Sequence, residues 1–355
     1  MNTLIRKSLI LLILCLLAGT ANLNAQTLTK VRYGGLGAGS VDIKNAYIFL
    51  GIEKGFFRNN GLAIQFFAFD SPSLAMAAAA RGETDSGDYG TPVYTAIAAG
   101  IPIKVIAALP RKSLGANLIA KNEYKSVADL KGKMILTGRP GAGGYTAFTK
   151  IIQANGFTTA DFKANTASVT ANDARLVLQK GDVEAIIITD PLVSVQIEQA
   201  GEGHVIAKLD DYYVYQHASF YATDAFINNN PDAVRRLLKS LSESAKYAYD
   251  HPDELYRFIN QKLGYDLKTI KKVYESNFGG NWNYTLTVKK DEVRKGFHLL
   301  IETGEIKKEQ YDALKDKDIF GFAQLFQYLE SVAGTFLIDR TVIIPLLERI
   351  FKILI

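Results

Sequence analysis

Short apolar runs alternate along the chain with longer stretches that have the spacing of helices. The runs at 62–66, 104–108 and 133–136 are each short enough to form one buried strand, and glycine or proline punctuates the segments between them. Helices that alternate with such strands are typical of parallel α/β units. The pattern therefore predicts an α/β fold.

Glycine and proline positions show that this unit occurs twice. Each copy has a glycine turn, a helix, a Gly-Phe stop, a second helix that ends in glycine, and a proline ten positions after that glycine. These features fall at 34–39, 46–54, Gly55-Phe56, Gly82 and Pro92 in the first copy, and at 141–143, 147–155, Gly156-Phe157, Gly181 and Pro191 in the second. Two copies predict two lobes. Ligands of such sheets bind beyond the carboxyl ends of the strands, at helix N-termini, so we expect one cleft shared by both lobes.

The first 25 residues have the pattern of a secretory signal peptide. A positively charged start precedes an apolar core at 8–18, and small residues follow, with cleavage expected after Ala21 or Ala25. The core is too short for a stable membrane span, so we expect export to the periplasm. Cys15, the only cysteine of the sequence, lies in this segment. The mature chain therefore has no thiol for a disulfide, a nucleophile or a metal site.

Charge and motif content argue against several function classes. The net charge of +5 is mild, and the sequence has no basic stripe with interleaved aromatic residues, which argues against nucleic-acid binding. No nucleophile elbow, zinc-ligand spacing or P-loop occurs, so we expect no catalytic residue, no metal and no cofactor.

The C-terminal tail at 331–355 is apolar, but charged residues and Pro345 interrupt it, which disfavours a membrane span. Its role stays open between an amphipathic helix packed on the protein, a helix on a membrane surface, and a tail that is not native to this fold.

Several motifs resemble those of the periplasmic substrate-binding proteins of ABC importers for nitrate, sulfonates and taurine. They are IEKGFF at 52–57 followed by NGLAI at 60–64, AARGETD at 79–85, AGIPIKVI at 99–106, SVADLKGK at 126–133 and LQKGDVEA at 178–185. The resemblance implies a type II periplasmic-binding-protein fold, in which two doubly wound sheets are joined by a two-strand hinge and the ligand cleft lies between the lobes. It also implies a discontinuous first lobe at 28–115 plus 215–330, and a second lobe at 116–214. We expect a monomer that closes on a small molecule and delivers it to ABC permease subunits.

The glycine turn before the second-copy helix is the first candidate ligand site. Backbone N–H groups of Gly143, Gly144, Tyr145 and Thr146 are expected as unpaired donors at a helix start, where the helix dipole favours a sulfonate, carboxylate or phosphate group. The alternative is an ordinary tight turn. A dinucleotide fingerprint is ruled out, because Thr146 stands where the third glycine would be.

The first copy offers a counterpart and further polar candidates at helix starts and strand ends. The expected ligand contacts there are Gly39, Ser40, Ser71, Ser73, Asp88, Tyr89 and Thr91. For Ser40 the alternative is capping of its own helix.

Asp190, at the end of the apolar strand 186–188, bears on the charge of the ligand. A carboxylate in the cleft would repel an anion unless that ligand also carries an amine, as taurine does. The alternative is a structural Asp-Pro turn in which the carboxylate caps a helix.

These observations predict an extracytoplasmic solute receptor for a small anionic or zwitterionic organic ligand, such as a sulfonate, taurine or a carboxylate. A nitrate-like oxyanion also stays open. Two alternatives remain, a binding protein for a pyrimidine precursor of thiamine and the ligand-binding module of a sensor. The fold also resembles that of the eukaryotic thiamine-pyrimidine synthases, but those enzymes carry a cysteine-rich motif that the mature chain lacks.

Overall fold

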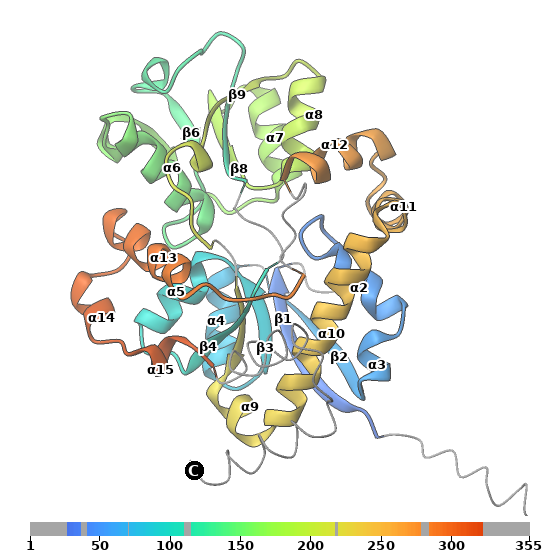
Figure 1. Ribbon diagram of the computed structural model, residues 1–355. Helices are drawn as coiled ribbons and strands as arrows, with labels where there is room; N and C mark the ends of the chain where they lie inside the picture. Colours follow the sequence, from blue (N-terminus) through green and yellow to red (C-terminus); the bar gives the residue numbers. More distant parts are fainter. Residues whose placement is uncertain are drawn as a thin grey trace, which may run out of the picture.

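The computed structural model describes residues 27–36, 41–69, 71–109, 115–216, 219–277 and 284–321. The expected signal peptide, the tail at 331–355, Gly39 and Ser40 lie outside these residues. The described chain forms two lobes, one above the other in Figure 1, and each is built around its own five-stranded sheet.

The first sheet has the strand order β2-β1-β3-β10-β4. Its strands are β1 (Thr29–Leu36), β2 (Leu62–Phe69), β3 (Ser86–Tyr89), β4 (Ile103–Ala108) and β10 (Ser219–Thr223). β1 runs parallel to β2 and β3, whereas β10 is antiparallel to both of its neighbours. Because β10 follows the strands of the second sheet in the sequence, the chain returns to the first sheet after building the second.

The second sheet repeats this plan with the order β7-β6-β8-β5-β9. Its strands are β5 (Asn117–Ala120), β6 (Met134–Leu136), β7 (Lys163–Asn165), β8 (Ala185–Ile188) and β9 (His204–Lys208). β6 runs parallel to β7 and β8, and the fourth strand, β5, is again antiparallel to its neighbours. The predicted two-lobed α/β fold is thereby confirmed, and each predicted parallel sheet carries one antiparallel strand.

Helices cover both sheets. Those of the first lobe are α2 (Ala46–Glu53), α3 (Phe56–Asn59), α4 (Pro72–Ala80), α5 (Thr91–Ala98), α9 (Asp224–Asn229), α10 (Pro231–Asp250) and α11 (Pro252–Leu263). The second lobe has α6 (Gly143–Ala154), α7 (Ala171–Lys180) and α8 (Pro191–Gln199), with 3-10 turns η1 (Ala128–Leu130), η2 (Thr159–Asp161) and η3 (Leu209–Asp211). α12 (Leu267–Asn277), α13 (Lys290–Glu302), α14 (Lys308–Asp312) and α15 (Asp316–Ile319) complete the described chain.

The repeated Gly-Phe stops have a conformational reason. Gly55 and Gly156 follow the first helix of each copy and adopt φ values of 82° and 81°, a backbone conformation that residues with a Cβ rarely adopt. The apolar strand residues Val31, Val105, Leu118 and Ile186 are fully buried, so each sheet lies inside the core of its lobe. Among the described residues, no helix combines the length and the apolar character needed to cross a membrane.

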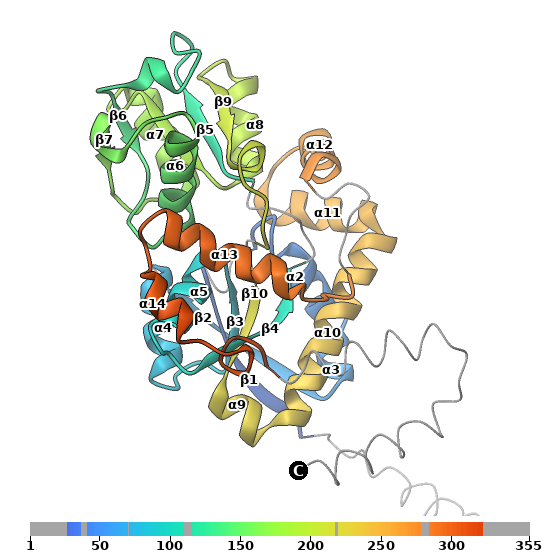
Figure 2. The same cartoon turned by 60° about the vertical axis from the view of Figure 1, so that its left-hand side comes forward.

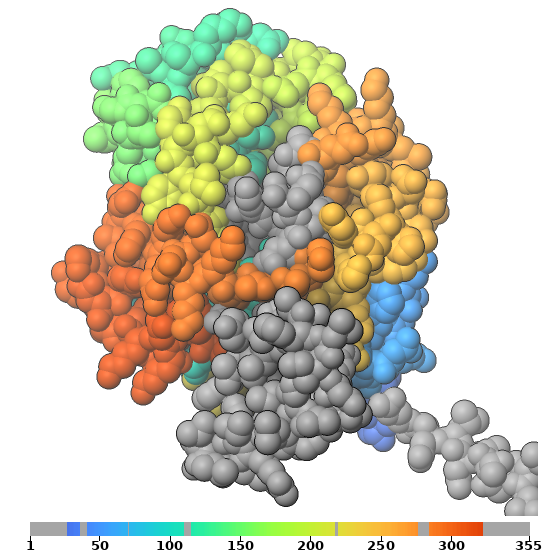
Figure 3. Space-filling view, viewed as in Figure 1, coloured from blue at the N-terminus to red at the C-terminus, as the bar shows by residue number. Residues whose placement is uncertain are grey.

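The C-terminal helices reach from the first lobe to the second on two sides. α12 packs against α8, and α13 packs against both α5 and α6. Figure 2 shows α13 lying beneath α6 and beside α5, and in Figure 3 orange atoms of this segment border the second lobe on both sides. The two lobes are therefore in contact at positions other than the chain crossings between the sheets.

Candidate functional site

A cleft of about 880 Å³ separates the two lobes. The carboxyl ends of β1, β3, β6 and β8 all open into it, as the strand-end rule for α/β sheets predicts. Of the residues proposed from the sequence, Asp88, Tyr89, Gly143, Gly144 and Asp190 line this cleft. Ser71, Ser73, Thr91, Tyr145 and Thr146 are not among its lining residues.

The start of α6 offers backbone donors to the cleft. After β6 the chain turns through Gly138 and Gly141, whose φ values are 75° and 82°, and the helix begins at Gly143. Its N-cap residue is Ala142, which has no side-chain oxygen, and the structure shows no side-chain cap at this end. The N–H groups of Gly143, Gly144 and Tyr145 precede the first turn of intrahelical hydrogen bonds, so they are open donors at the positive end of the helix dipole, and Gly143 and Gly144 line the cleft.

At this helix start, the N–H of Thr146 is not the unpaired donor that the sequence predicts. Its N–H donates to the carbonyl of Ala142 at 3.1 Å, because it is already the first residue of the helical hydrogen-bond ladder. Its hydroxyl, in a fully buried side chain, contacts the same carbonyl at 3.3 Å. The set of unpaired donors therefore ends at Tyr145.

Other helices that begin near the cleft differ at their N-termini: α4 and α7 have a side-chain cap, whereas α2 and α5 have none. Ser71 Oγ accepts the N–H of Leu74 at 3.3 Å in α4, and Thr170 caps α7 in the same way. α5 begins with Thr91-Pro92, and proline has no N–H to offer. Ser71 thus serves as a cap, Ser73 is exposed, and Thr91 is fully buried beside the cleft rather than on its surface.

Asp190 caps α8, as the structural alternative for this residue proposed. Its Oδ1 accepts the N–H groups of Leu192 at 2.9 Å and Val193 at 3.4 Å. The residue also lines the cleft, near Lys44 and Asp42. Burial raises the pKa of the Asp190 carboxyl above its ordinary value, and the charge of Asp42 adds to this, while Lys44 opposes it. Asp190 therefore caps α8 and lines the cleft at the same time, so the two roles weighed for it do not exclude each other.

Aromatic side chains form the first-lobe wall of the cleft. The Tyr33 hydroxyl donates to Asp88 Oδ1 at 2.6 Å, and its ring meets that of Phe66 edge to face with centroids 5.6 Å apart. Phe66 in turn stacks on Phe49 at 4.8 Å. Burial, together with the adjacent Asp88 carboxylate, raises the pKa of Tyr33 well above its ordinary value, so it stays a neutral donor. The wall suits an apolar or aromatic ligand body that lies next to a carboxylate.

Tyr89 adds a buried hydroxyl to this wall. Its side chain is 4 % exposed, and the hydroxyl has no hydrogen-bond partner among the described residues. Burial raises the pKa of this phenol as well, so it is a neutral group that can donate or accept. A buried polar atom without a partner is uncommon, and here it belongs to a residue that lines the cleft.

Sequence reasoning missed the aromatic wall, Lys44 and Tyr265. Phe66 and Phe69 lie at the carboxyl end of β2, so the strand-end rule was a signal that could have identified them. Tyr265 follows α11 far along the chain, and it lines the cleft together with Asn172 of the second lobe. No local pattern marks such a residue, because only the fold brings it to the cleft.

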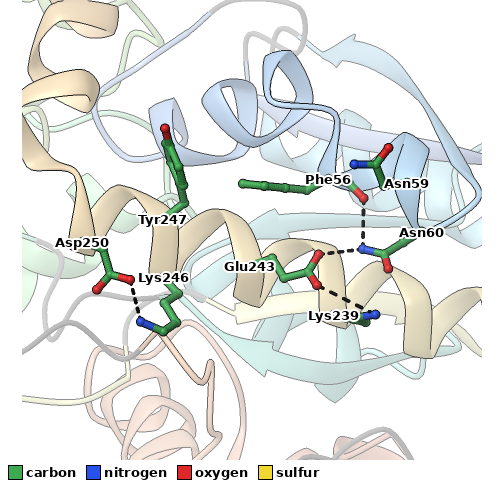
Figure 4. Close-up of a pocket in the computed structure, with 8 residues that line it drawn as sticks. All are labelled: Phe56, Asn59, Asn60, Lys239, Glu243, Lys246, Tyr247 and Asp250. Carbon is green, nitrogen blue, oxygen red and sulfur yellow. Dashed lines mark hydrogen bonds and ion pairs between the residues drawn. The ribbon is translucent and has the colours of Figure 1, made fainter.

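A second hollow of about 500 Å³ lies between α3 and α10 on the first lobe (Figure 4). Its charged side chains are already paired with each other: Lys246 with Asp250 at 2.5 Å, and Lys239 with Glu243 at 3.8 Å. Asn60 also donates to Glu243 at 2.7 Å. The cleft between the lobes, with its open helix end and unpartnered hydroxyl, is therefore the better candidate site.

Two lobes that enclose a cleft, with an open helix N-terminus on one side and an aromatic wall on the other, define a solute-binding protein. The NMT1/THI5-like family matches residues 43–255, more than half of the chain, so the chain belongs to this family. The family resemblance seen in the sequence motifs is thereby confirmed.

Individual relatives agree with this placement. A protein of Bacillus subtilis (strain 168) named as an aliphatic sulfonates-binding protein is 24% identical over 232 residues, which are 63% of this chain and 68% of that protein. The 4-amino-5-hydroxymethyl-2-methylpyrimidine phosphate synthase of Aspergillus parasiticus is 21% identical over 251 residues, 66% of this chain and 72% of the enzyme. The alkanesulfonate-binding protein SsuA of Xanthomonas axonopodis pv. citri, solved with bound MOPS, superimposes with a TM-score of 0.66. It shares 16% identity, with 79% of this chain and 94% of SsuA covered, and so shows the fold.

Proposed function

We propose that the protein is an extracytoplasmic solute receptor of an ABC importer, which closes its two lobes on a small organic anion or zwitterion. The observation that carries this proposal is the uncapped start of α6 at an interlobe cleft. Three successive N–H groups and the positive end of a helix dipole suit a sulfonate or carboxylate head. The relatives named for sulfonate binding support the same choice of ligand.

The ligand contacts that we propose come from both lobes. The second lobe supplies the N–H groups of Gly143, Gly144 and Tyr145. The first lobe supplies Asp88, Tyr89 and the aromatic wall, so that closure brings both sets of contacts to one ligand. Asp190 and Lys44 together determine the local charge of the cleft, and the Asp190 carboxylate favours a ligand that also carries an amine.

In this proposal the first 25 residues direct export to the periplasm, and ABC permease subunits receive the ligand. The cleft catalyses no reaction, and its role is to bind and release. Lobes at 28–115 plus 215–330 and at 116–214 move as the two halves of a hinge.

A binding protein for a thiamine-related pyrimidine is the second candidate. The observation that favours it is the stack of Phe49 and Phe66 beside the Tyr33–Asp88 pair, which suits a flat ring bearing amino groups. The synthase among the relatives is named for such a pyrimidine.

A matched ligand series separates these candidates. Thermal shift and calorimetry would compare ethanesulfonate, taurine, propionate, nitrate and 4-amino-5-hydroxymethyl-2-methylpyrimidine, and small-angle scattering would follow closure. We expect a rise in melting temperature and a smaller radius of gyration with a sulfonate or its amino derivative. Binding of the pyrimidine alone would replace the first candidate by the second, and the absence of any ligand-induced closure would contradict the receptor function.

A further inference from the structure

The turn that ends α13 places a carboxylate against the second lobe. α13 ends at Glu302, Thr303 is its C-cap residue, and Gly304 follows with a φ of 76°. The N–H of Glu305 donates to the carbonyl of Leu300 at 2.8 Å, and Ile306 is buried in the core just after it. Both flanks of Glu305 are therefore fixed, and its side chain has a defined direction.

The Glu305 side chain reaches the glycine turn that precedes α6. Its Oε2 accepts the N–H of Gly141 at 2.8 Å, and its Oε1 lies 3.1 Å from the hydroxyl of Thr303, which is closer to the carbonyl of Leu299 at 2.9 Å. The side chain of Thr146, in the first turn of α6, lies near this carboxylate and helps to lower its pKa. One side chain thus ties the end of α13 to the glycine turn and lies beside the first turn of α6.

The element that carries Glu305 is anchored on the first lobe. The ring of Phe297 in α13 lies 5.1 Å from that of Tyr94 in α5, and Gly296 lets the two helices approach closely around Tyr94. Figure 2 shows α13 between the two lobes, with α5 on one side and α6 on the other. Glu305 consequently ties a turn of the second lobe to a helix of the first.

Stability of the fold does not account for a carboxylate at this position. Burial raises the pKa of Glu305 above its ordinary value, even though the nearby hydroxyls of Thr146 and Thr303 and the N–H of Gly141 act in the opposite direction. A carboxyl with a raised pKa in the folded state stabilises the fold when protonated, and this contribution is lost as the pH rises through that pKa. At neutral pH the charged form is therefore unfavourable for folding, whereas it is the stronger acceptor for the Gly141 N–H.

We propose that Glu305 is a positioning residue that fixes the glycine turn and aims the N–H groups of Gly143, Gly144 and Tyr145 into the cleft. The proposal rests on the proposed function of this helix end as the ligand's anion site. Glu305 lies outside residues 43–255, so the family match itself contains no sign of it.

Two substitutions of Glu305 and one control test this role in the full chain. Glu305→Ala removes the acceptor, and Glu305→Gln keeps an oxygen acceptor for Gly141 without the charge. Glu302→Gln is the matched control, because Glu302 pairs with Lys150 of α6 at 2.5 Å across the same interface but does not touch the glycine turn. Hydrogen exchange of the amides at 138–146, calorimetric affinity for ethanesulfonate, and melting temperature would be measured for each.

We expect Glu305→Ala to speed exchange at 138–146 and to weaken ethanesulfonate binding, each by about tenfold, the effect of losing one hydrogen bond to a charged group. Glu305→Gln should stay within about threefold of the wild type in both, with a melting temperature no lower than that of the wild type. Glu302→Gln should leave exchange at 138–146 unchanged.

Unchanged exchange in Glu305→Ala, or equal effects of Glu305→Ala and Glu302→Gln, would overturn the proposal. Thr303→Val, which removes the hydroxyl 3.1 Å from Glu305 Oε1, takes the place of Glu305→Ala if that variant fails to fold. Its expected direction is the same and its effect smaller. If the wild type does not bind ethanesulfonate, the anion site is contradicted, while the exchange data still decide the role of Glu305.

Discussion

Helices α6 and α8 follow two adjacent strands of the same sheet, and their N-termini are capped in opposite ways. β6 and β8 are adjacent parallel strands, with Leu136 opposite Ile186, so both helices start at the same edge. α8 is closed by Asp190, which accepts two of its N–H groups, and by Pro191, which has none. α6 starts from Ala142 and two glycines, and its first donors have no side-chain cap.

The difference teaches that the chain satisfies one helix end from within and leaves the neighbouring end without a side-chain acceptor, as the proposed anion site requires. Both ends have the same backbone dipole, so the contrast lies in the side chain at the N-cap. It also places the Asp190 carboxylate next to the proposed anion site, with Lys44 nearby as a counter-charge.

The largest expected effect comes from giving α6 the cap that α8 already has. Ala142→Asp should reduce affinity for ethanesulfonate by about 100-fold, because its carboxylate would both occupy the N–H groups and repel the anion. The same change should stabilise the helix by about 1 kcal/mol. Calorimetry and denaturant unfolding would measure the two effects.

Two further substitutions at Ala142 separate capping from bulk. Ala142→Ser supplies a neutral cap and should weaken binding by about fivefold, since a ligand must displace about 1 kcal/mol of capping. Valine is at least as large as serine but has no acceptor, so Ala142→Val should change the affinity for ethanesulfonate by less than about threefold. Equal losses for Ser and Val would mean that bulk, and not capping, blocks the site.

A smaller effect is expected when the cap of α8 is removed. Asp190→Ala should lower the free energy of unfolding by about 1 kcal/mol, because Leu192 and Val193 lose their acceptor. Its affinity for ethanesulfonate should not fall, since a neighbouring negative charge is lost. An affinity loss of tenfold or more, measured by calorimetry, would instead make Asp190 a direct ligand contact.

The smallest effect concerns pH. Asparagine can cap a helix as well as aspartate, so Asp190→Asn retains the cap and removes the buried charge. The pKa of Asp190 is raised in the fold, and its contribution to stability is therefore present at low pH and lost as the pH rises through that pKa. We expect the variant to melt about 2 °C above the wild type near pH 7, with the difference vanishing near pH 4. A difference that grows on acidification would contradict the raised pKa.

Local patterns in the sequence were enough to predict the repeat and the place of the cleft. Glycine turns at equivalent positions marked the starts of both repeats, and the strand-end rule placed Asp88, Tyr89 and Asp190 at the cleft. The direction of β5 and β10 was not predictable in this way. Strand composition does not reveal direction, which follows from the path of the chain between the sheets.

Gly144 lines the cleft as the sequence predicts, but there is also a structural reason for a glycine at this position. A Cβ at this position would lie 3.0 Å from the carbonyl oxygen of Thr137, so a side chain there would push the helix a few tenths of an ångström away from its strand, whatever binds in the cleft. Sequence alone suggested only ligand approach. Tyr265 and Glu305 were missed for another reason, since each acts on a segment more than ninety residues away in the chain.

The contacts of α12 with α8 and of α13 with α6 have a consequence for how affinity evolves. These helices lie beyond residues 43–255 and contact the second lobe, so in the proposed receptor they would bias how far apart the lobes rest before a ligand arrives. The apparent affinity of a closing receptor is its intrinsic affinity multiplied by the fraction of molecules already competent to bind. Substitutions in this distal segment can therefore retune the working concentration range of the receptor while every residue that touches the solute stays the same.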